Sequence, residues 1–144
     1  MAKLASDRII VLRDIGDYRT AIAACETYAR FVDVDHPNGR ESIVGVHLHK
    51  GLILRDLGRM HEAVQVCDEI IADSATDTDQ ALRPIVALAL RNKANILQEL
   101  AWPEAAADVY AELVARFAND DQPQILEQVT LARKWLVVLR TRER

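Results

Sequence analysis

The histidines and one acidic loop are the first places in this chain where metal chemistry could occur. His47 and His49 lie two residues apart, and on a helix that spacing points the two rings to different sides, so they cannot share a metal ion. The segment 33–39 has carboxylates spaced as in a calcium loop. However, Pro37 takes its fifth position and the glycine comes one place late, which indicates a turn with helix-capping carboxylates. We therefore expect no metal site.

The two cysteines are the remaining candidates for a reactive group. Cys25 and Cys67 are far apart in the sequence and form no CxxC motif, so a disulfide framework is not expected. Neither has a neighbouring histidine or a basic setting that would activate a nucleophile, and both are interpreted as core residues. The sequence also contains no glycine-rich phosphate loop, GxSxG or HExxH motif. We expect no catalytic residue, no cofactor and no enzyme activity.

Composition favours helices. The 144 residues are 50% hydrophobic and include only 5 glycines and 4 prolines. The net charge of −4, with both signs interspersed, gives no basic patch for nucleic acid or a membrane surface. No apolar run reaches the ~18 residues that a membrane span needs. An acidic residue, Asp7, lies where a signal peptide needs its apolar centre, so we expect a cytoplasmic protein.

The chain repeats itself. Small residues at Gly16, Gly58 and Ala101 recur at intervals of 42 and 43 residues, each after an apolar pattern of helical spacing. A glycine allows the left-handed turn that ends a helix. Further positions match in register: Ala21, Ala63 and Ala106; Cys25, Cys67 and Tyr110; Tyr28, Ile70 and Leu113.

These patterns predict an all-α chain of seven helices that form a single domain, residues 1–144. Polar loops rich in turn residues separate the repeats. Pro84 leaves two alternatives, a late helix start or a kink. The helices are expected near 3–15, 18–33, 40–57, 60–73, 79–100, 103–118 and 123–141; the repeats cover about 3–35, 40–75 and 79–118, followed by the terminal helix 123–141.

At these positions the sequence resembles the tetratricopeptide repeat (TPR) family. In the middle unit Gly51, Gly58, Ala63, Cys67 and Ile70 fill the family's small and aromatic slots. Ala94, Ala101, Ala106, Tyr110 and Leu113 fill them in the third unit, whereas Ile9 stands at a small-residue slot of the first. The long period alone favours HEAT-like repeats, and the slot pattern favours the long-period bacterial type of TPR. Either resemblance implies an α-solenoid of about three helical hairpins plus a C-terminal helix.

The resemblance implies a scaffold or adaptor that binds a protein or peptide on the concave face formed by the first helices. Charged residues near helix ends are also common without any binding role. Arg91 and Asn95 lie one turn apart, as in family members that grip a C-terminal carboxylate, but the rest of that cluster is missing. The residues implied for the concave face are Arg13, Asp14, Leu48, Leu52, Arg55, Asp56, Arg91, Asn95, Gln98 and Glu99.

The last helix carries apolar side chains almost all round. A capping helix would have one polar flank, and Trp135 stands where the repeat prefers a small residue. One alternative is that the helix buries an outer face in a homodimer or a protein partner, through Val129, Trp135, Val138 and Leu139. The other is that it folds back on the array and buries that face itself. The functions left open beside the scaffold are a self-assembling structural module and a regulatory sensor that binds a small peptide.

Overall fold

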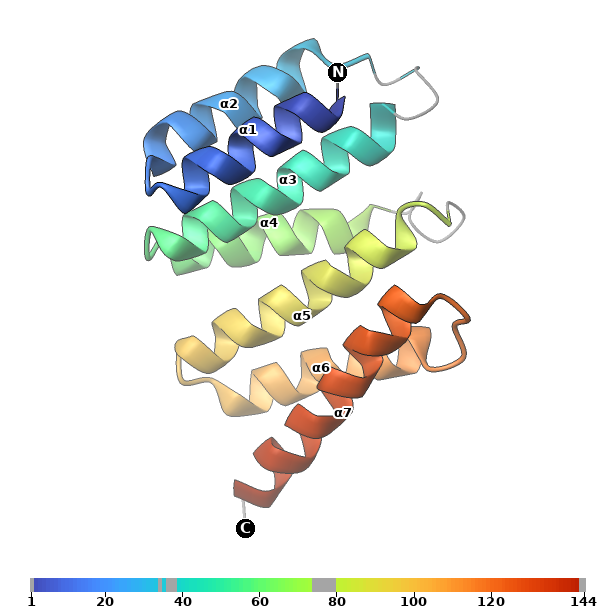
Figure 1. The fold of residues 1–144 in the computed structure, drawn as a ribbon. Helices are drawn as coiled ribbons and strands as arrows, with labels where there is room; N and C mark the ends of the chain where they lie inside the picture. Colours follow the sequence, from blue (N-terminus) through green and yellow to red (C-terminus); the bar gives the residue numbers. More distant parts are fainter. Residues whose placement is uncertain (1, 34, 36–38, 74–79, 143–144) are drawn as a thin grey trace. The chain divides into compact units, whose positions relative to one another are not determined.

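A computed structural model describes residues 2–33, 35, 39–73 and 80–142 (Figure 1). Within these ranges the chain forms seven helices and no strand, which confirms the predicted all-α class. Most of the loop 33–39, including His36, and residues 74–79 of the next loop lie outside the described residues. The helices are α1 (Ala2–Asp14), α2 (Tyr18–Phe31), α3 (Gly39–Asp56), α4 (Met60–Ala72), α5 (Arg83–Glu99), α6 (Pro103–Phe117) and α7 (Pro123–Arg142).

The helix boundaries lie close to the predicted ones except at the start of α5. This helix begins at Arg83, after a turn at residues 80–82, and not near residue 79. The reason is Pro84, which lacks a backbone N–H and therefore fits the first turn of a helix but not its interior. The late start is thus the correct alternative for Pro84.

The three predicted corners share one backbone conformation. Gly16, Gly58 and Ala101 have φ angles of 82°, 78° and 61°, and Ala101 is the one non-glycine residue with positive φ in the described part of the chain. At each corner the residue's N–H binds the carbonyl three residues back, and the next N–H binds the carbonyl five residues back. The second bond joins Asp17 to Leu12, Arg59 to Leu54 and Trp102 to Leu97, each at 2.9 Å. This pair of bonds is the Schellman motif, which satisfies the last carbonyls of a helix.

The residue after each corner also starts the second helix of the hairpin. The carbonyls of Asp17, Arg59 and Trp102 each accept a 3.0 Å bond from the N–H of the alanine four residues on. Those alanines, Ala21, Ala63 and Ala106, are fully buried. The sequence repeat therefore corresponds to a repeated helical hairpin: α1 with α2, α3 with α4, and α5 with α6.

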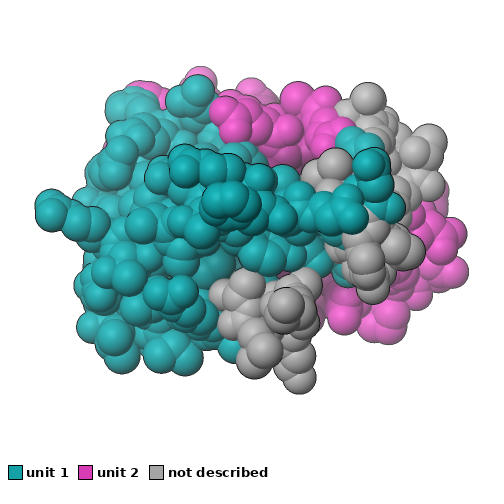
Figure 2. Space-filling model, turned by 90° about the horizontal axis from the view of Figure 1, so that it is seen from above, with its two compact units in different colours: residues 1–66 teal, residues 67–144 magenta. Residues whose placement is uncertain are grey.

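The chain divides into two compact units, residues 1–66 and 67–144, with the division inside α4 (Figure 2). In unit 1, the three helices α1, α2 and α3 pack against one another. The core of this unit is formed around Ile9, Ala21, Cys25, Val46 and Ile53.

Unit 1 also shows why the repeat has a small residue in the middle of the first helix. A Cβ atom added at Gly51 of α3 would lie 3.1 Å from Cγ1 of Val66 in α4. The two helices approach this closely because Gly51 has no side chain. In the first hairpin Ile9 occupies the equivalent slot and is buried, so an aliphatic side chain can also be accommodated there.

In unit 2, the helices α5, α6 and α7 pack against one another in the same manner as α1, α2 and α3. The core includes Leu90, Ala94, Tyr110, Leu113 and Ile125, all fully buried. Arg83 at the start of α5 forms an ion pair with Asp120, whose side chain is buried in the α6–α7 connection. In the residues that the structure covers, no helix is long and apolar enough to cross a membrane.

Candidate functional site

In unit 1, two of the predicted partner-binding residues of the first helices contact each other. Arg13 Nε of α1 donates to Asp56 Oδ2 of α3 at 2.6 Å, and both side chains are about 30% exposed. Leu48 is buried, and Leu52 and Arg55 are half-buried. Of the six residues predicted here, Asp14 and Asp56 are the two that count as exposed. The structure therefore brings α1 and α3 side by side as expected, and the Arg13–Asp56 ion pair links the two helices.

In unit 2, two of the predicted residues are hydrogen-bonded to a core tyrosine. Tyr110 of α6 donates its hydroxyl proton to Asn95 Oδ1 at 2.5 Å and accepts from Gln98 Nε2 at 2.7 Å. The tyrosine is fully buried, so its hydroxyl needs these partners. Asn95 and Gln98 thus provide the hydrogen-bond partners of a hydroxyl inside the α5–α6 hairpin, while Glu99 beside them is exposed.

Arg91 has a comparable structural contact. Its Nη1 donates to Oε1 of Gln128 in α7 at 2.8 Å, and Gln128 is one of the few buried polar residues. Arg91 and Asn95 are thus both engaged within unit 2, Arg91 through Nη1 and Asn95 through Oδ1, whereas Arg91 Nε is buried without a hydrogen-bond partner.

The terminal helix α7 has one buried face, and two residues of the predicted contact surface lie on it. Val129 and Leu139 are 4% and 2% exposed, because α7 packs against α5 and α6. These two residues are part of the interior of unit 2, so the fold itself covers them and leaves little of either side chain accessible to a partner. The whole buried face follows helical spacing of three and four residues: Ile125, Val129, Ala132, Leu136 and Leu139.

The other two predicted contact residues lie on a second, accessible side of α7. Trp135 and Val138 are each 38% exposed, and Leu131, one turn earlier, is half-buried. At 100° per residue, these three side chains share one side of the helix, which we name the open flank. Of the two alternatives for α7, the structure shows the helix folded back on α5 and α6 along one face; burial of the open flank in a homodimer or a protein partner stays a prediction.

Charged side chains border the open flank. Glu127 precedes Leu131 by one turn and Lys134 follows it by three residues, and both are exposed. Together with Thr130 and Thr141 they form a polar crest opposite the buried face. The sequence expectation of apolar residues almost all round α7 missed this crest, although the spacing of the four polar residues was a signal that could have revealed it.

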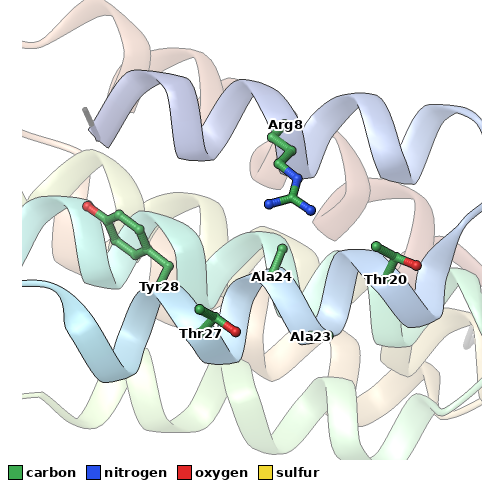
Figure 3. Close-up of a pocket in the computed structure, with 6 residues that line it drawn as sticks. All are labelled: Arg8, Thr20, Ala23, Ala24, Thr27 and Tyr28. Atoms are coloured by element: carbon green, nitrogen blue, oxygen red, sulfur yellow. The ribbon is translucent and has the colours of Figure 1, made fainter.

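Two shallow hollows in unit 1 were not predicted. One, of about 290 Å³, lies between α1 and α2 and is shown in Figure 3, where the Arg8 side chain of α1 extends toward α2. The spacing of small and hydroxyl residues along α2 was the available sequence signal. The residues lining it are Arg8, Thr20, Ala23, Ala24, Thr27 and Tyr28.

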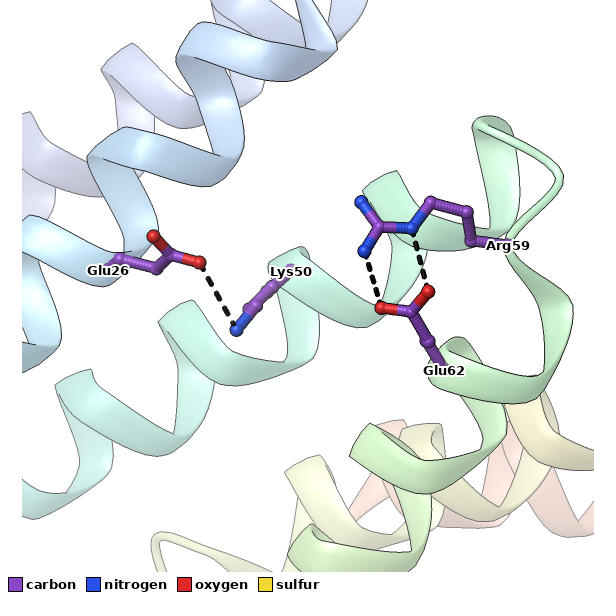
Figure 4. Close-up of polar contacts among 4 residues, drawn as sticks. All are labelled: Glu26, Lys50, Arg59 and Glu62. Atoms are coloured by element: carbon purple, nitrogen blue, oxygen red, sulfur yellow. Dashed lines mark hydrogen bonds and ion pairs between the residues drawn. The ribbon is translucent and has the colours of Figure 1, made fainter.

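The second hollow, of about 300 Å³, is lined by Arg19, Ile22, Leu57 and Arg59. Arg59 is held by Glu62 through two bonds, of 2.9 Å and 2.5 Å, as Figure 4 shows together with the 3.7 Å ion pair between Lys50 and Glu26. The guanidinium is therefore already paired, and this hollow has no buried polar group that points to a ligand.

The thiols are buried and poorly ionised. Burial raises the pKa of Cys25 to about 11, and Lys50 offsets this only in part. Burial likewise raises the pKa of Cys67 to about 11, with a further contribution from Asp68. Both cysteines are core residues, as predicted, and neither is a thiolate nucleophile at neutral pH.

His47 and His49 of α3 are both half-buried. His49 is half-buried, and burial together with the nearby Arg13 lowers its pKa, so its ring is held neutral. Across the described ranges, no group of three or more histidine, cysteine or acidic side chains is arranged to hold a metal ion. Comparison of the chain with protein-family models, with curated proteins and with solved structures gives no match.

Proposed function

We propose that the chain is a non-catalytic protein-interaction module that binds a helical protein segment on the open flank of α7, without a cofactor. We also propose that its hairpins stack as an α-solenoid of the tetratricopeptide type. The three identical corners and the buried alanines that follow them support this second proposal, because a regular repeat of one hairpin is what a solenoid requires.

One comparison within the repeat carries the proposal for the open flank. Ile9, Gly51, Ala94 and Trp135 recur at intervals of 42, 43 and 41 residues, so they occupy equivalent positions in α1, α3, α5 and α7. The first three are buried, and Gly51 lies directly against the second helix of its hairpin. Trp135 is exposed. In α1, α3 and α5 the side that carries this position is buried. The equivalent side of α7 is apolar and accessible.

The size of Trp135 limits what can cover this side. Ile9 is the largest side chain at this position in the three hairpins. A two-ring side chain is too large for the close approach seen between Gly51 and Val66. A helix on the open flank must therefore lie farther away and pack around the indole, as an interface anchored by tryptophan does.

A pull-down with matched variants tests the proposed function. Trp135→Lys places a charge on the open flank, whereas Val137→Lys places the same charge at a 67% exposed position on another side of α7. Wild type and Val137→Lys are expected to retain a stoichiometric protein partner, either another protein or the chain's own copy, and Trp135→Lys is expected to lose it. Equal retention by both variants, with unchanged helical circular dichroism, would refute the assignment of the open flank.

The first-helix surface of unit 1 is the second candidate, with a peptide as its ligand. The observation in its favour is the accessible Arg13–Asp56 pair, since a peptide could offer each group a replacement partner. Arg55→Ala should weaken such binding and leave association through the open flank intact.

A further inference from the structure

The charges along α7 differ between its two ends. Before Leu131, the exposed charged residue of the helix is the acidic Glu127. After it, the exposed charged residues are the basic Arg133, Lys134 and Arg140. An occupant that lies along the open flank with the opposite charge order would be attracted at both ends, and charge order of this kind fixes the orientation of packed helices.

The chain itself supplies a helix with that charge order. In an antiparallel pair of α7 helices, a residue that precedes the two-fold axis lies opposite one that follows it. Glu127 and Lys134 are related in this way by an axis beside Leu131, four residues after the first and three before the second. At 100° per residue, Glu127 and Lys134 lie about 40° and about 60° to the same side of Leu131, so both border the same edge of the open flank.

We propose that the open flank binds the open flank of a second copy of this chain, as an antiparallel α7 pair whose two-fold axis passes beside Leu131. Glu127 of each copy then lies beside Lys134 of the other, and the two indoles of Trp135 pack on either side of the axis. This proposal rests on the proposed function, since it names the helical segment that the open flank takes.

A parallel pair of the same helices is disfavoured by the same charges. In a parallel pair, Glu127 of one copy and Lys134 of the other are about 10 Å apart along the helices, so neither attractive pair forms. An isologous pair also closes on itself, so the product is a dimer and not a fibre. The antiparallel dimer buries Leu131, Trp135 and Val138 of both copies, which are the exposed or half-buried apolar residues of the flank.

The interface is small, because one helix of 20 residues contributes from each copy. Such an area belongs to weak or transient associations, with dissociation constants on the order of 10 μM. Association should therefore be followed by sedimentation velocity from about 1 μM to about 1 mM, the range that brackets such a constant. Wild type is expected to change from monomer to dimer, and a chain that stays monomeric throughout overturns the proposal.

A charge-exchange series tests the orientation. Glu127→Lys and Lys134→Glu each replace two attractive pairs with two repulsive ones, and each should weaken dimerisation about tenfold. The double variant restores opposite charges and should dimerise as wild type does. Arg133→Glu, on another side of the same helix, is the matched control and should change little. A double variant as weak as the single ones overturns the antiparallel pairing.

Disulfide trapping gives a second, independent readout. In the antiparallel pair, position 127 of one copy lies opposite position 134 of the other, while the two copies of position 127 are about 10 Å apart along the helix direction. A mixture of Glu127→Cys and Lys134→Cys chains should therefore form the mixed disulfide and little of either symmetric one. Cys25 and Cys67 are buried and should not compete.

The two levels of the proposal fail in different ways. If wild type is monomeric but the pull-down retains another protein that Trp135→Lys loses, the homodimer is refuted and the proposed function stands. If Trp135→Lys changes neither the dimer nor any partner, both are refuted. Preferential trapping of symmetric disulfides overturns the antiparallel arrangement.

Discussion

The corner glycine Gly58 allows the energy of the repeated hairpin turn to be measured without a steric contribution. Its φ angle is 78°, and a Cβ atom added there would have no neighbour within 4 Å. Replacement by alanine therefore changes little besides the backbone energy. The left-handed conformation costs a residue with a Cβ roughly 1–2 kcal/mol. Alanine recovers about 0.4–1 kcal/mol because its unfolded chain has less conformational entropy to lose. The expected net effect of Gly58→Ala is a destabilisation of about 1 kcal/mol.

Gly45 provides the matched control in the same unit. It lies inside α3, its φ angle is not positive, and an added Cβ atom would again have no neighbour within 4 Å. Gly45→Ala should therefore stabilise the chain by about 0.5–1 kcal/mol, the usual gain inside a helix. Ala101→Gly is the reverse experiment at the third corner, where φ is 61°. Relief of the strained conformation should exceed the entropic cost of glycine and leave a gain of about 1 kcal/mol.

Urea unfolding followed by far-UV circular dichroism measures all three variants. Since the chain has two compact units, the unfolding curves should first be tested for two-state behaviour and fitted with two transitions where they need it. Gly58→Ala and Gly45→Ala should shift the midpoint in opposite directions. If Gly58→Ala is as stable as wild type, or if both substitutions act with the same sign, the positive φ of the corners does not favour glycine over alanine.

Two further predictions concern the core. Tyr110→Phe removes the hydroxyl that Asn95 and Gln98 share, and should lower the stability of unit 2 by about 1–2 kcal/mol, measured by urea unfolding. The pKa values of Cys25 and Cys67, raised by burial to about 11, predict a loss of stability as the pH rises from the ordinary thiol range through pH 11. Between the ordinary thiol pKa and about 11, the thiols ionise in the unfolded chain but stay protonated in the folded one. Ionisation therefore stabilises the unfolded state, and the free energy of unfolding falls as the pH rises. A Cys25→Ala/Cys67→Ala variant should lose this part of the slope, and an unchanged slope would contradict the cause.

The hairpin corners could be predicted from the sequence because their physics is local. A left-handed residue is needed where a helix ends and reverses, and glycine is the residue that takes that conformation at little cost. Gly16 and Gly58 therefore marked two corners directly. Ala101 was identified only through its register with them, since alanine alone is not a signal of positive φ. The start of α5 was missed by a few residues because Pro84 permits two local outcomes, and the decision depends on the turn before it.

The candidate site was less predictable because it depends on how helices far apart in sequence face one another. Apolar residues occur on several sides of α7, so composition alone could not separate the buried Val129 and Leu139 from the exposed Trp135 and Val138. Only the packing of α7 on α5 and α6 makes that division. The same limit applies to the polar residues of the first helices. Their spacing indicates a shared side, but not that Arg13 would pair with Asp56.

Variants of Arg91 can show whether the polar side of unit 2 stabilises the fold or is available to bind a ligand. Its bond to the buried amide of Gln128 ties α5 to α7, and Arg91→Met would leave that amide oxygen without its donor. Removing one partner of a buried hydrogen bond costs about 1–3 kcal/mol, whereas replacing both by apolar groups can be nearly neutral. Arg91→Met and Gln128→Leu should therefore each destabilise unit 2, and the double variant should be more stable than the sum of the two effects allows, by about 1 kcal/mol or more. If Arg91→Met leaves the unfolding curve unchanged, the contact is not structural, and the side of α5 that carries Arg91 becomes a binding surface again.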